Sequence, residues 1–121
     1  MKLRVYLDTS VFSAYCDARV PDRQAATEEL WTRLDDFEAT TSELARQELE
    51  SVSEQSLRSR LRQLLDGVVV FPITEEMDDL ARKYLAAGIL GPAMFNDALH
   101  VAAAVLTRQD VLLSWNFRHL V

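Results

Sequence analysis

The pattern of apolar and polar residues divides the chain into short strands that alternate with helices. Apolar runs with the length of strands cover residues 2–7, 37–41, 68–71 and 111–113. Apolar residues at three- and four-residue spacing predict helices over residues 10–16, 22–36, 43–52, 53–65, 75–87 and 97–108. Such alternation favours a parallel sheet with helices on both faces. We therefore expect one α/β domain over residues 1–121.

Polar residues and glycine mark the ends of these elements. Asp22, Ser42, Thr74 and Asn96 are predicted helix N-caps, because their side chains accept hydrogen bonds from the first turn. Gly88 is the natural residue to follow the helix that ends near position 87. The unbroken apolar run 68–71 is typical of a strand buried on both faces.

The first strand ends on a carboxylate. Asp8 follows residues 2–7 and is followed in turn by Thr9 and Ser10. In open α/β sheets, ligands bind beyond the carboxyl ends of the strands. Asp8 is therefore a candidate site residue, but an ordinary N-cap of the next helix explains it equally well.

A second carboxylate opens an unusually apolar helix. Asp97 precedes a segment in which nearly every residue is small or apolar, so that helix must be buried almost all round. A carboxylate at the mouth of a buried helix is costly unless backbone donors or a cation compensate it.

Several oxygen-bearing side chains are expected at the same end of the sheet. Asp8 follows the first strand, Glu48 lies on the helix after the second, Asp97 opens the helix before the last, and Asn116 follows the last. Converging carboxylates repel one another and require positive charge. Oxygen ligands suit Mg²⁺ or Mn²⁺ rather than zinc, and these ions support phosphodiester hydrolysis.

Composition narrows the class of protein. The net charge of −6 argues against a broad basic surface for nucleic acid, although a bound cation would reverse the sign locally. No apolar run has the length of a membrane span and no signal peptide is recognisable. The only cysteine is Cys16, so no intramolecular disulfide can form. We expect a cytoplasmic protein that does not bind membranes.

Four segments resemble, in order and spacing, the motifs of the PIN-domain family: residues 7–12, 42–49, 96–102 and 113–117. The resemblance implies a three-layer α/β/α sandwich with a central parallel sheet. It also implies a metal-dependent endoribonuclease that uses Mg²⁺ or Mn²⁺ and hydrolyses RNA. Many bacterial relatives are toxins of the VapC type, which implies an antitoxin partner and a homodimer. Members often continue beyond the last motif, so the C-terminus is expected to be either shortened or truncated.

The resemblance also implies roles for individual residues. Asp8, Glu48 and Asp97 match the three family acids, which hold the metal and orient the attacking water. Ser10 matches a hydroxyl position that supports Asp8 or a metal-bound water. Many members carry a fourth acid where this chain has Asn116, and an amide can coordinate through oxygen but brings no charge. Glu43 is a less favoured alternative to Glu48.

Alternatives remain for the other candidate residues. His100, one turn after Asp97, either faces the site or packs beside it. Trp115 either stacks a nucleic-acid base or packs at the edge of the sheet. His119 either contacts RNA or lies on the surface. A basic helix face that is either solvated or binds phosphate comprises Arg58, Arg60 and Arg62.

Two functions from different classes follow. The first is a metal-dependent ribonuclease, expected to be the toxin of a toxin–antitoxin pair. The second, motivated by the neutral Asn116 and the acidic composition, is a PIN-fold module that binds RNA or protein and is inactive or weakly active. A nuclease that cuts DNA with the same site is a third alternative.

Overall fold

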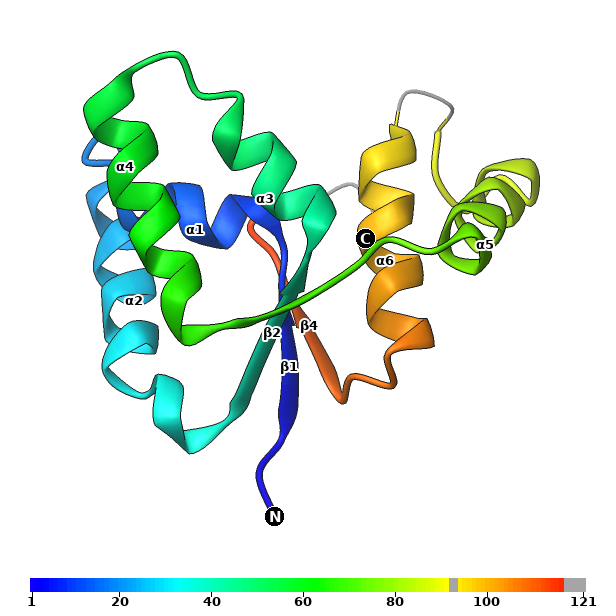
Figure 1. Cartoon of the computed structure of the whole chain (residues 1–121), viewed down its shortest axis with the longest axis horizontal. Helices are drawn as coiled ribbons and strands as arrows, with labels where there is room; N and C mark the ends of the chain where they lie inside the picture. Colours follow the sequence, from blue (N-terminus) through cyan, green and yellow to red (C-terminus); the bar gives the residue numbers. More distant parts are fainter. Residues whose placement is uncertain (92–93, 117–121) are drawn as a thin grey trace.

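A four-stranded parallel sheet forms the centre of the molecule (Figure 1). The computed structural model describes residues 1–91 and 94–116. The spatial order of the strands is β3-β2-β1-β4. Their bounds are β1 Arg4–Leu7, β2 Glu38–Ser42, β3 Val69–Phe71 and β4 Val111–Leu113. The predicted strands are therefore confirmed, with bounds that differ by one or two residues at most.

The first strand lies inside the sheet, as expected of a strand that carries a site residue at its end. Val5 pairs with Ala39 on β2 and with Val111 on β4. Val5, Tyr6 and Leu7 are all at least 96% buried, because helices cover both faces of this strand.

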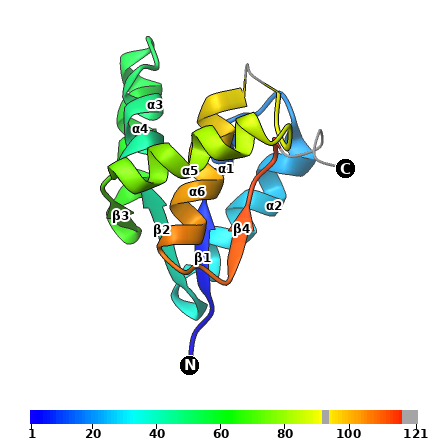
Figure 2. The same ribbon diagram turned by 90° about the vertical axis from the view of Figure 1, so that its right-hand side faces the viewer.

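Helices pack on both faces of the sheet, so the predicted three-layer sandwich is correct (Figures 1 and 2). Within the described residues they are α1 Thr9–Tyr15, α2 Pro21–Thr32, α3 Glu43–Glu50, α4 Gln55–Leu64, α5 Glu75–Ala86 and α6 Phe95–Leu106. One core joins Tyr6 to the apolar sides of α5 and α6. The other joins Val5 and Leu7 to α1, α2 and α4. Short 3₁₀ turns at Leu34–Asp36 and Leu65–Gly67 lead into β2 and β3.

Two predicted caps are wrong. Helix α2 begins at Pro21 with Val20 as its N-cap residue, and Asp22 lies inside the first turn. Proline is favoured at the first helical position because it has no N–H to leave unpaired. Helix α6 likewise begins two residues before its predicted start, at Phe95, which places Asn96 in its first turn. The predicted helix starts are therefore wrong by one or two residues.

Two other boundaries behave as predicted. The hydroxyl of Thr74 accepts a hydrogen bond from the backbone N–H of Met77 at 3.2 Å. Gly88 follows α5 with a φ of 73°, the left-handed conformation that glycine adopts without strain. Ser42 does precede α3, but its hydroxyl is hydrogen-bonded to Tyr6 and caps no helix.

The prediction that β3 is buried on both faces is wrong. Strand β3 lies at the edge of the sheet, and Val69 is 58% exposed. An apolar run of four residues does not distinguish an edge strand from an interior one, because β-branched residues favour both. No helix in the described part of the chain is long and apolar enough to cross a membrane.

Removing the Thr74 cap should destabilise the protein modestly. Thr74→Ala leaves the N–H of Met77 without its side-chain acceptor and should lower the free energy of unfolding by about 1 kcal/mol. Thr74→Ser keeps the hydroxyl and should stay within a few tenths of wild type. Urea unfolding followed by circular dichroism measures both, and equal losses in the two variants would contradict the capping role.

Candidate active site

Asp8 is a buried carboxylate held by hydroxyl groups. It lies directly after β1 and is 99% buried. Its Oδ1 accepts hydrogen bonds from the backbone N–H of Ser10 at 2.9 Å and from the Ser10 hydroxyl at 2.5 Å. Its Oδ2 accepts a third from the hydroxyl of Ser114 at 2.5 Å. Asp8 therefore caps α1 and also receives a donor from the segment after β4.

Backbone N–H groups of residues 115 and 116 are hydrogen-bonded to both of these serines. The N–H of Trp115 donates to the Ser10 hydroxyl at 2.8 Å, and the N–H of Asn116 donates to the Ser114 hydroxyl at 2.9 Å. Each serine thus accepts a backbone bond while it donates to Asp8. This arrangement ties the ends of β1 and β4 together, as the parallel topology predicts.

Asp8 has no basic partner: among the described residues, no Lys or Arg forms an ion pair with it. Hydroxyl and amide donors offset part of the cost of burying the charge, but they bring no positive charge of their own. Each carboxylate oxygen has two lone pairs; Oδ1 already accepts two hydrogen bonds, whereas Oδ2 accepts one and keeps capacity for another ligand. A buried, unpaired carboxylate of this kind is suited to a cation.

Glu48 lies on α3, next to α1, the helix that Asp8 caps, and at the same end of the sheet as Asp8. Its Oε1 accepts hydrogen bonds from the hydroxyl of Thr9 at 2.6 Å and from Nε2 of His100 at 2.9 Å. Its side chain is 32% exposed. The alternative acid, Glu43, instead forms an ion pair with Arg46 at 2.9 Å. The structure therefore places Glu48, and not Glu43, beside the residues that follow β1.

A chain of buried hydrogen bonds fixes the imidazole that holds Glu48. Nδ1 of His100 lies 2.7 Å from the Tyr6 hydroxyl, which lies 2.7 Å from the Ser42 hydroxyl. Burial raises the pKa of Tyr6 well above its usual range, so the phenol keeps its proton. Nε2–H of His100 donates to Glu48, and the hydroxyls of Tyr6 and Ser42 continue the chain from Nδ1.

These contacts set the acidity of Glu48. Burial by itself raises the pKa of the Glu48 carboxyl, but hydrogen bonds with His100, Thr9 and Asn96 and the electrostatic attraction of His100 together lower it further than burial raises it. The net result is a pKa below the usual range for glutamate. Glu48 is therefore held as a carboxylate, the form in which it can bind a cation.

The other predicted site residues occupy the same end of the sheet. Asp97 lies in the first turn of α6 and is partly buried, one turn before His100. Asn116 lines a cavity of about 250 Å³ together with Ser10, Thr9 and Glu48. His119 lies outside the described residues.

The oxygen donors fit a divalent cation in type, but they are not gathered into one cluster. In the part of the chain that the structure describes, no three side chains of His, Cys, Asp or Glu are placed to hold a metal ion together. Glu48 is turned toward Thr9 and His100, and Asp8 toward its two serines. Hard carboxylate oxygens without cysteine favour Mg²⁺ or Mn²⁺ on chemical grounds.

Sequence reasoning missed three of the contacts that shape this site. Thr9 follows Asp8, and Ser114 lies directly after β4. The presence of hydroxyl residues just beyond the ends of these two strands could have indicated their contacts. Tyr6 gave no signal, because it reads as an ordinary strand residue. Both alternatives for His100 hold: it is packed in the interior, where it is 98% buried, and it also contacts the candidate site residue Glu48.

Comparisons with known proteins agree with this fold. The PIN domain family model matches residues 5–118. No curated protein matches the chain significantly. Among solved structures, the Mycobacterium tuberculosis toxin VapC20, which cleaves the sarcin–ricin loop, has a TM-score of 0.75 at 17% identity, with 94% of this chain and 91% of that chain covered.

Two further structures share the fold at similarly low identity. A toxin–antitoxin complex from Klebsiella pneumoniae has a TM-score of 0.67 at 17% identity and covers 94% of this chain and 88% of that one. VapBC2 from Rickettsia felis, bound to a DNA fragment from its promoter, has a TM-score of 0.66 at 15% identity, with coverages of 96% and 92%.

Removing the Thr9 hydroxyl should raise the pKa of Glu48. In Thr9→Val one donor is lost while burial remains, whereas Thr9→Ser keeps the donor and should leave the pKa near that of wild type. Carbon-detected NMR titration of the Glu48 carboxyl measures the shift. A pKa in Thr9→Val equal to that of wild type would refute the role of the hydroxyl.

The same substitution should change the response of stability to acid. A lowered carboxyl pKa stabilises the folded state above the unfolded value of 4.5, and this contribution is lost as the pH falls through the folded pKa. Thr9→Val reduces that contribution, so its melting temperature should fall less steeply than that of wild type below pH 4.5. Melting curves at several acidic pH values test this.

Proposed function

The chain belongs to the PIN-domain family, and from that membership and the geometry of its acids we propose that it is a metal-dependent endoribonuclease, the toxin of a toxin–antitoxin pair. The observation that carries the proposal is Asp8, a buried carboxylate with no basic partner among the described residues, at the carboxyl end of an interior strand. Structural neighbours that are toxins or toxin–antitoxin complexes support the biological role.

Asp8, Glu48 and Asp97 are the proposed metal ligands, with Asn116 as an additional oxygen donor. Bound Mg²⁺ or Mn²⁺ would supply a Lewis acid that activates water and stabilises the leaving oxygen. Ser10 and Ser114 hold the Asp8 carboxylate in one orientation. His100 and Thr9 keep Glu48 ionised, and Glu48 must turn from these partners toward Asp8 if both are to hold one ion.

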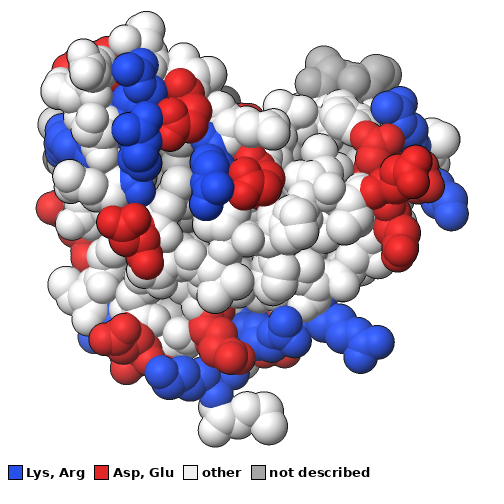
Figure 3. Space-filling model, in the orientation of Figure 1, with Lys and Arg blue, Asp and Glu red and all other residues white. Residues whose placement is uncertain are grey.

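The proposed partners are an RNA substrate, an antitoxin protein and a second copy of the chain. On the face shown in Figure 3, basic side chains form one narrow column at the upper left, and elsewhere acidic and basic side chains alternate around a largely uncharged middle. RNA would therefore be held by a few cationic contacts and by the bound metal, in keeping with the net charge of −6.

A PIN-fold module that binds RNA or protein without cutting it is the second candidate. It is favoured by the hydrogen bonds that already occupy Asp8 and Glu48, by the absence of a three-residue metal cluster within the described residues, and by the uncharged Asn116. The two functions differ in one measurable property, because only the enzyme releases shorter RNA in the presence of metal.

Cleavage should require both metal and Asp8. Purified protein should cut labelled single-stranded RNA in Mg²⁺ or Mn²⁺ but not in EDTA. Asp8→Asn keeps the shape and the capping oxygen, and it should slow cleavage by roughly a hundredfold or more, because even residues behind metal ligands are worth 10- to 100-fold. Glu43→Gln, on the same helix as Glu48, is the matched control and should cut normally.

The outcomes separate the two candidates. Cleavage that persists in a variant with both Asp8→Asn and Asp97→Asn would refute the proposed site. RNA that binds and stays intact with every metal tested would favour the binding module. The same assay with single-stranded DNA tests the third alternative, a DNA nuclease.

Placing an acid at position 116 should strengthen metal binding. Asn116→Asp adds a charge at the cavity that Glu48 lines, so the affinity for Mn²⁺ measured by calorimetry should rise several-fold. Asp110→Asn is a control, because Asp110 binds Arg4 at the opposite end of β1 and should leave the affinity unchanged. An unchanged affinity in Asn116→Asp would place the ion away from this residue.

A further inference from the structure

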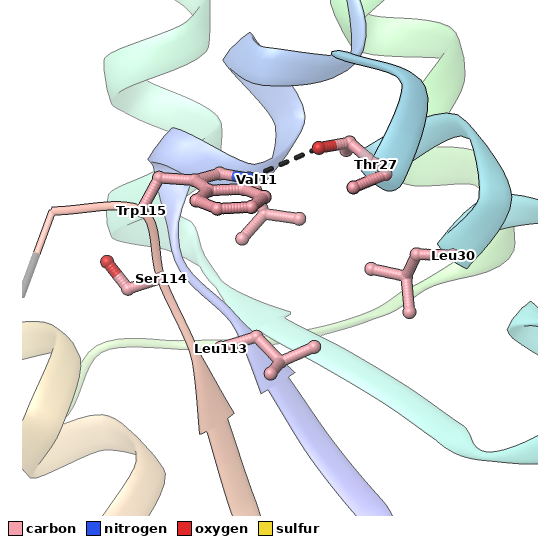
Figure 4. A pocket seen from close by; sticks show the side chains of 7 residues that line it. Val11, Thr27, Leu30, Leu113, Ser114 and Trp115 are labelled. Atoms are coloured by element: carbon pink, nitrogen blue, oxygen red, sulfur yellow. Dashed lines mark hydrogen bonds between the residues drawn. The ribbon is translucent and has the colours of Figure 1, made fainter. Parts of the chain in front are cut away.

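A second cavity adjoins the acids but contains almost no charge. It has a volume of about 320 Å³ and lies between α1, α2 and the end of β4 (Figure 4). Its walls are mainly apolar, with the hydroxyls of Thr27 and Ser114 among them, and its lining residues are Val11, Ala26, Thr27, Leu30, Leu113, Ser114 and Trp115. Ser114 lines this cavity and also donates to Asp8, so the two sites share a wall.

Trp115 presents a fixed aromatic surface to this cavity. Its indole Nε1–H donates to the hydroxyl of Thr27 at 3.1 Å, and its backbone N–H donates to Ser10. Figure 4 shows the ring above Val11, with the hydrogen bond to Thr27 fixing its edge. The residue is nevertheless 38% exposed. Both contacts order the ring before any ligand arrives, which lowers the entropic cost of stacking against it.

Arg23 places a cation between the two cavities. Its guanidinium carbon lies 5.1 Å from the centroid of the Trp115 ring, and the residue also lines the cavity that contains Glu48 and Asn116. No carboxylate in the described part of the chain forms an ion pair with Arg23. Its acidic neighbour Asp17 is paired with Arg19 at 2.9 Å. Arg23 therefore has its charge available for an anion.

We propose that this apolar cavity, with Trp115 and Arg23, is a nucleotide subsite: an unpaired base of the RNA occupies the cavity against Trp115, and Arg23 contacts the adjoining phosphate. Stacked aromatics and guanidinium–phosphate contacts are the usual means of holding single strands. The hydroxyls of Thr27 and Ser114 donate to the carbonyl oxygen of Arg23 and to Asp8, so each has a lone pair left to accept a hydrogen bond from the edge of the base. The subsite rests on the proposed function for its ligand, since it places that RNA beside Asp8.

The subsite can be tested by filling the cavity without touching the acids. Ala26 is an exposed residue of α2 that lines the cavity, and its neighbour Ala25 is equally exposed but does not. Both are replaced by Phe in full-length Asp8→Asn protein, and binding of fluorescein-labelled single-stranded RNA is measured by anisotropy in EDTA. Ala26→Phe should weaken binding roughly 5- to 100-fold, the range for one stacked base, and Ala25→Phe should not.

The phosphate contact has its own measurement. Arg23→Gln should weaken binding and reduce the slope of log affinity against log salt by about 0.7, the value for one phosphate on a single strand. Arg33→Gln removes the same charge at the other end of α2 and should leave the slope unchanged. An oligonucleotide that lacks bases should lose its sensitivity to Ala26→Phe and keep its sensitivity to Arg23→Gln.

Stacking also has a spectroscopic signature. In Trp31→Phe protein Trp115 is the only tryptophan, and its fluorescence should be quenched as RNA binds. Equal binding by Ala26→Phe and Ala25→Phe, or no binding of RNA at all, would overturn the subsite. These measurements are made without cleavage, so a protein that binds as expected but does not cut RNA in Mg²⁺ or Mn²⁺ would refute the proposed enzyme and leave the subsite standing.

Discussion

The burial of Asp8 without a basic partner is the constraint on which this end of the molecule depends. A carboxylate removed from water needs donors on both oxygens, and two elements supply them after β1 has placed Asp8: the first turn of α1 provides Ser10, and the segment after β4 provides Ser114. The backbone of that segment then closes on the same two serines. The fold at this edge therefore holds one buried carboxylate in a single orientation.

The orientation and the pKa of Glu48 depend on a separate set of hydrogen bonds. Its contacts reach through His100 to Tyr6 and Ser42, so residues from β1, β2, α3 and α6 meet in one buried chain. Apolar packing alone would align these elements only approximately, whereas the chain of hydrogen bonds sets the orientation of each polar group. The bond from His100, which ends this chain, also lowers the pKa of Glu48. Structure and acidity thus have a common cause, and replacing Tyr6 or His100 would disturb both.

Sequence reasoning predicts this site well where topology decides, and poorly where side-chain geometry decides. The ends of parallel strands must share one edge, so the position of Asp8 beside the segment that contains Asn116 follows from the order of the elements. The contact between His100 and Glu48 does not, because it depends on how α3 and α6 are rotated relative to β1. The exposed edge of β3 and the caps of α2 and α6 were mispredicted because secondary-structure propensity does not show which other elements pack against a residue.

The distribution of charge indicates how this acidic protein would engage the RNA that we propose as its substrate. With a net charge of −6, long-range attraction to RNA is absent, and binding must come from short-range contacts that screening by salt affects less. Asp17 and Arg19 neutralise each other beside the cavity, whereas Arg23 has no such partner among the described residues. Trp115 adds attraction that does not depend on charge. Because such contacts are few, the strand must present both a phosphate and a free base at the right spacing, which makes an unpaired region a better ligand than a duplex.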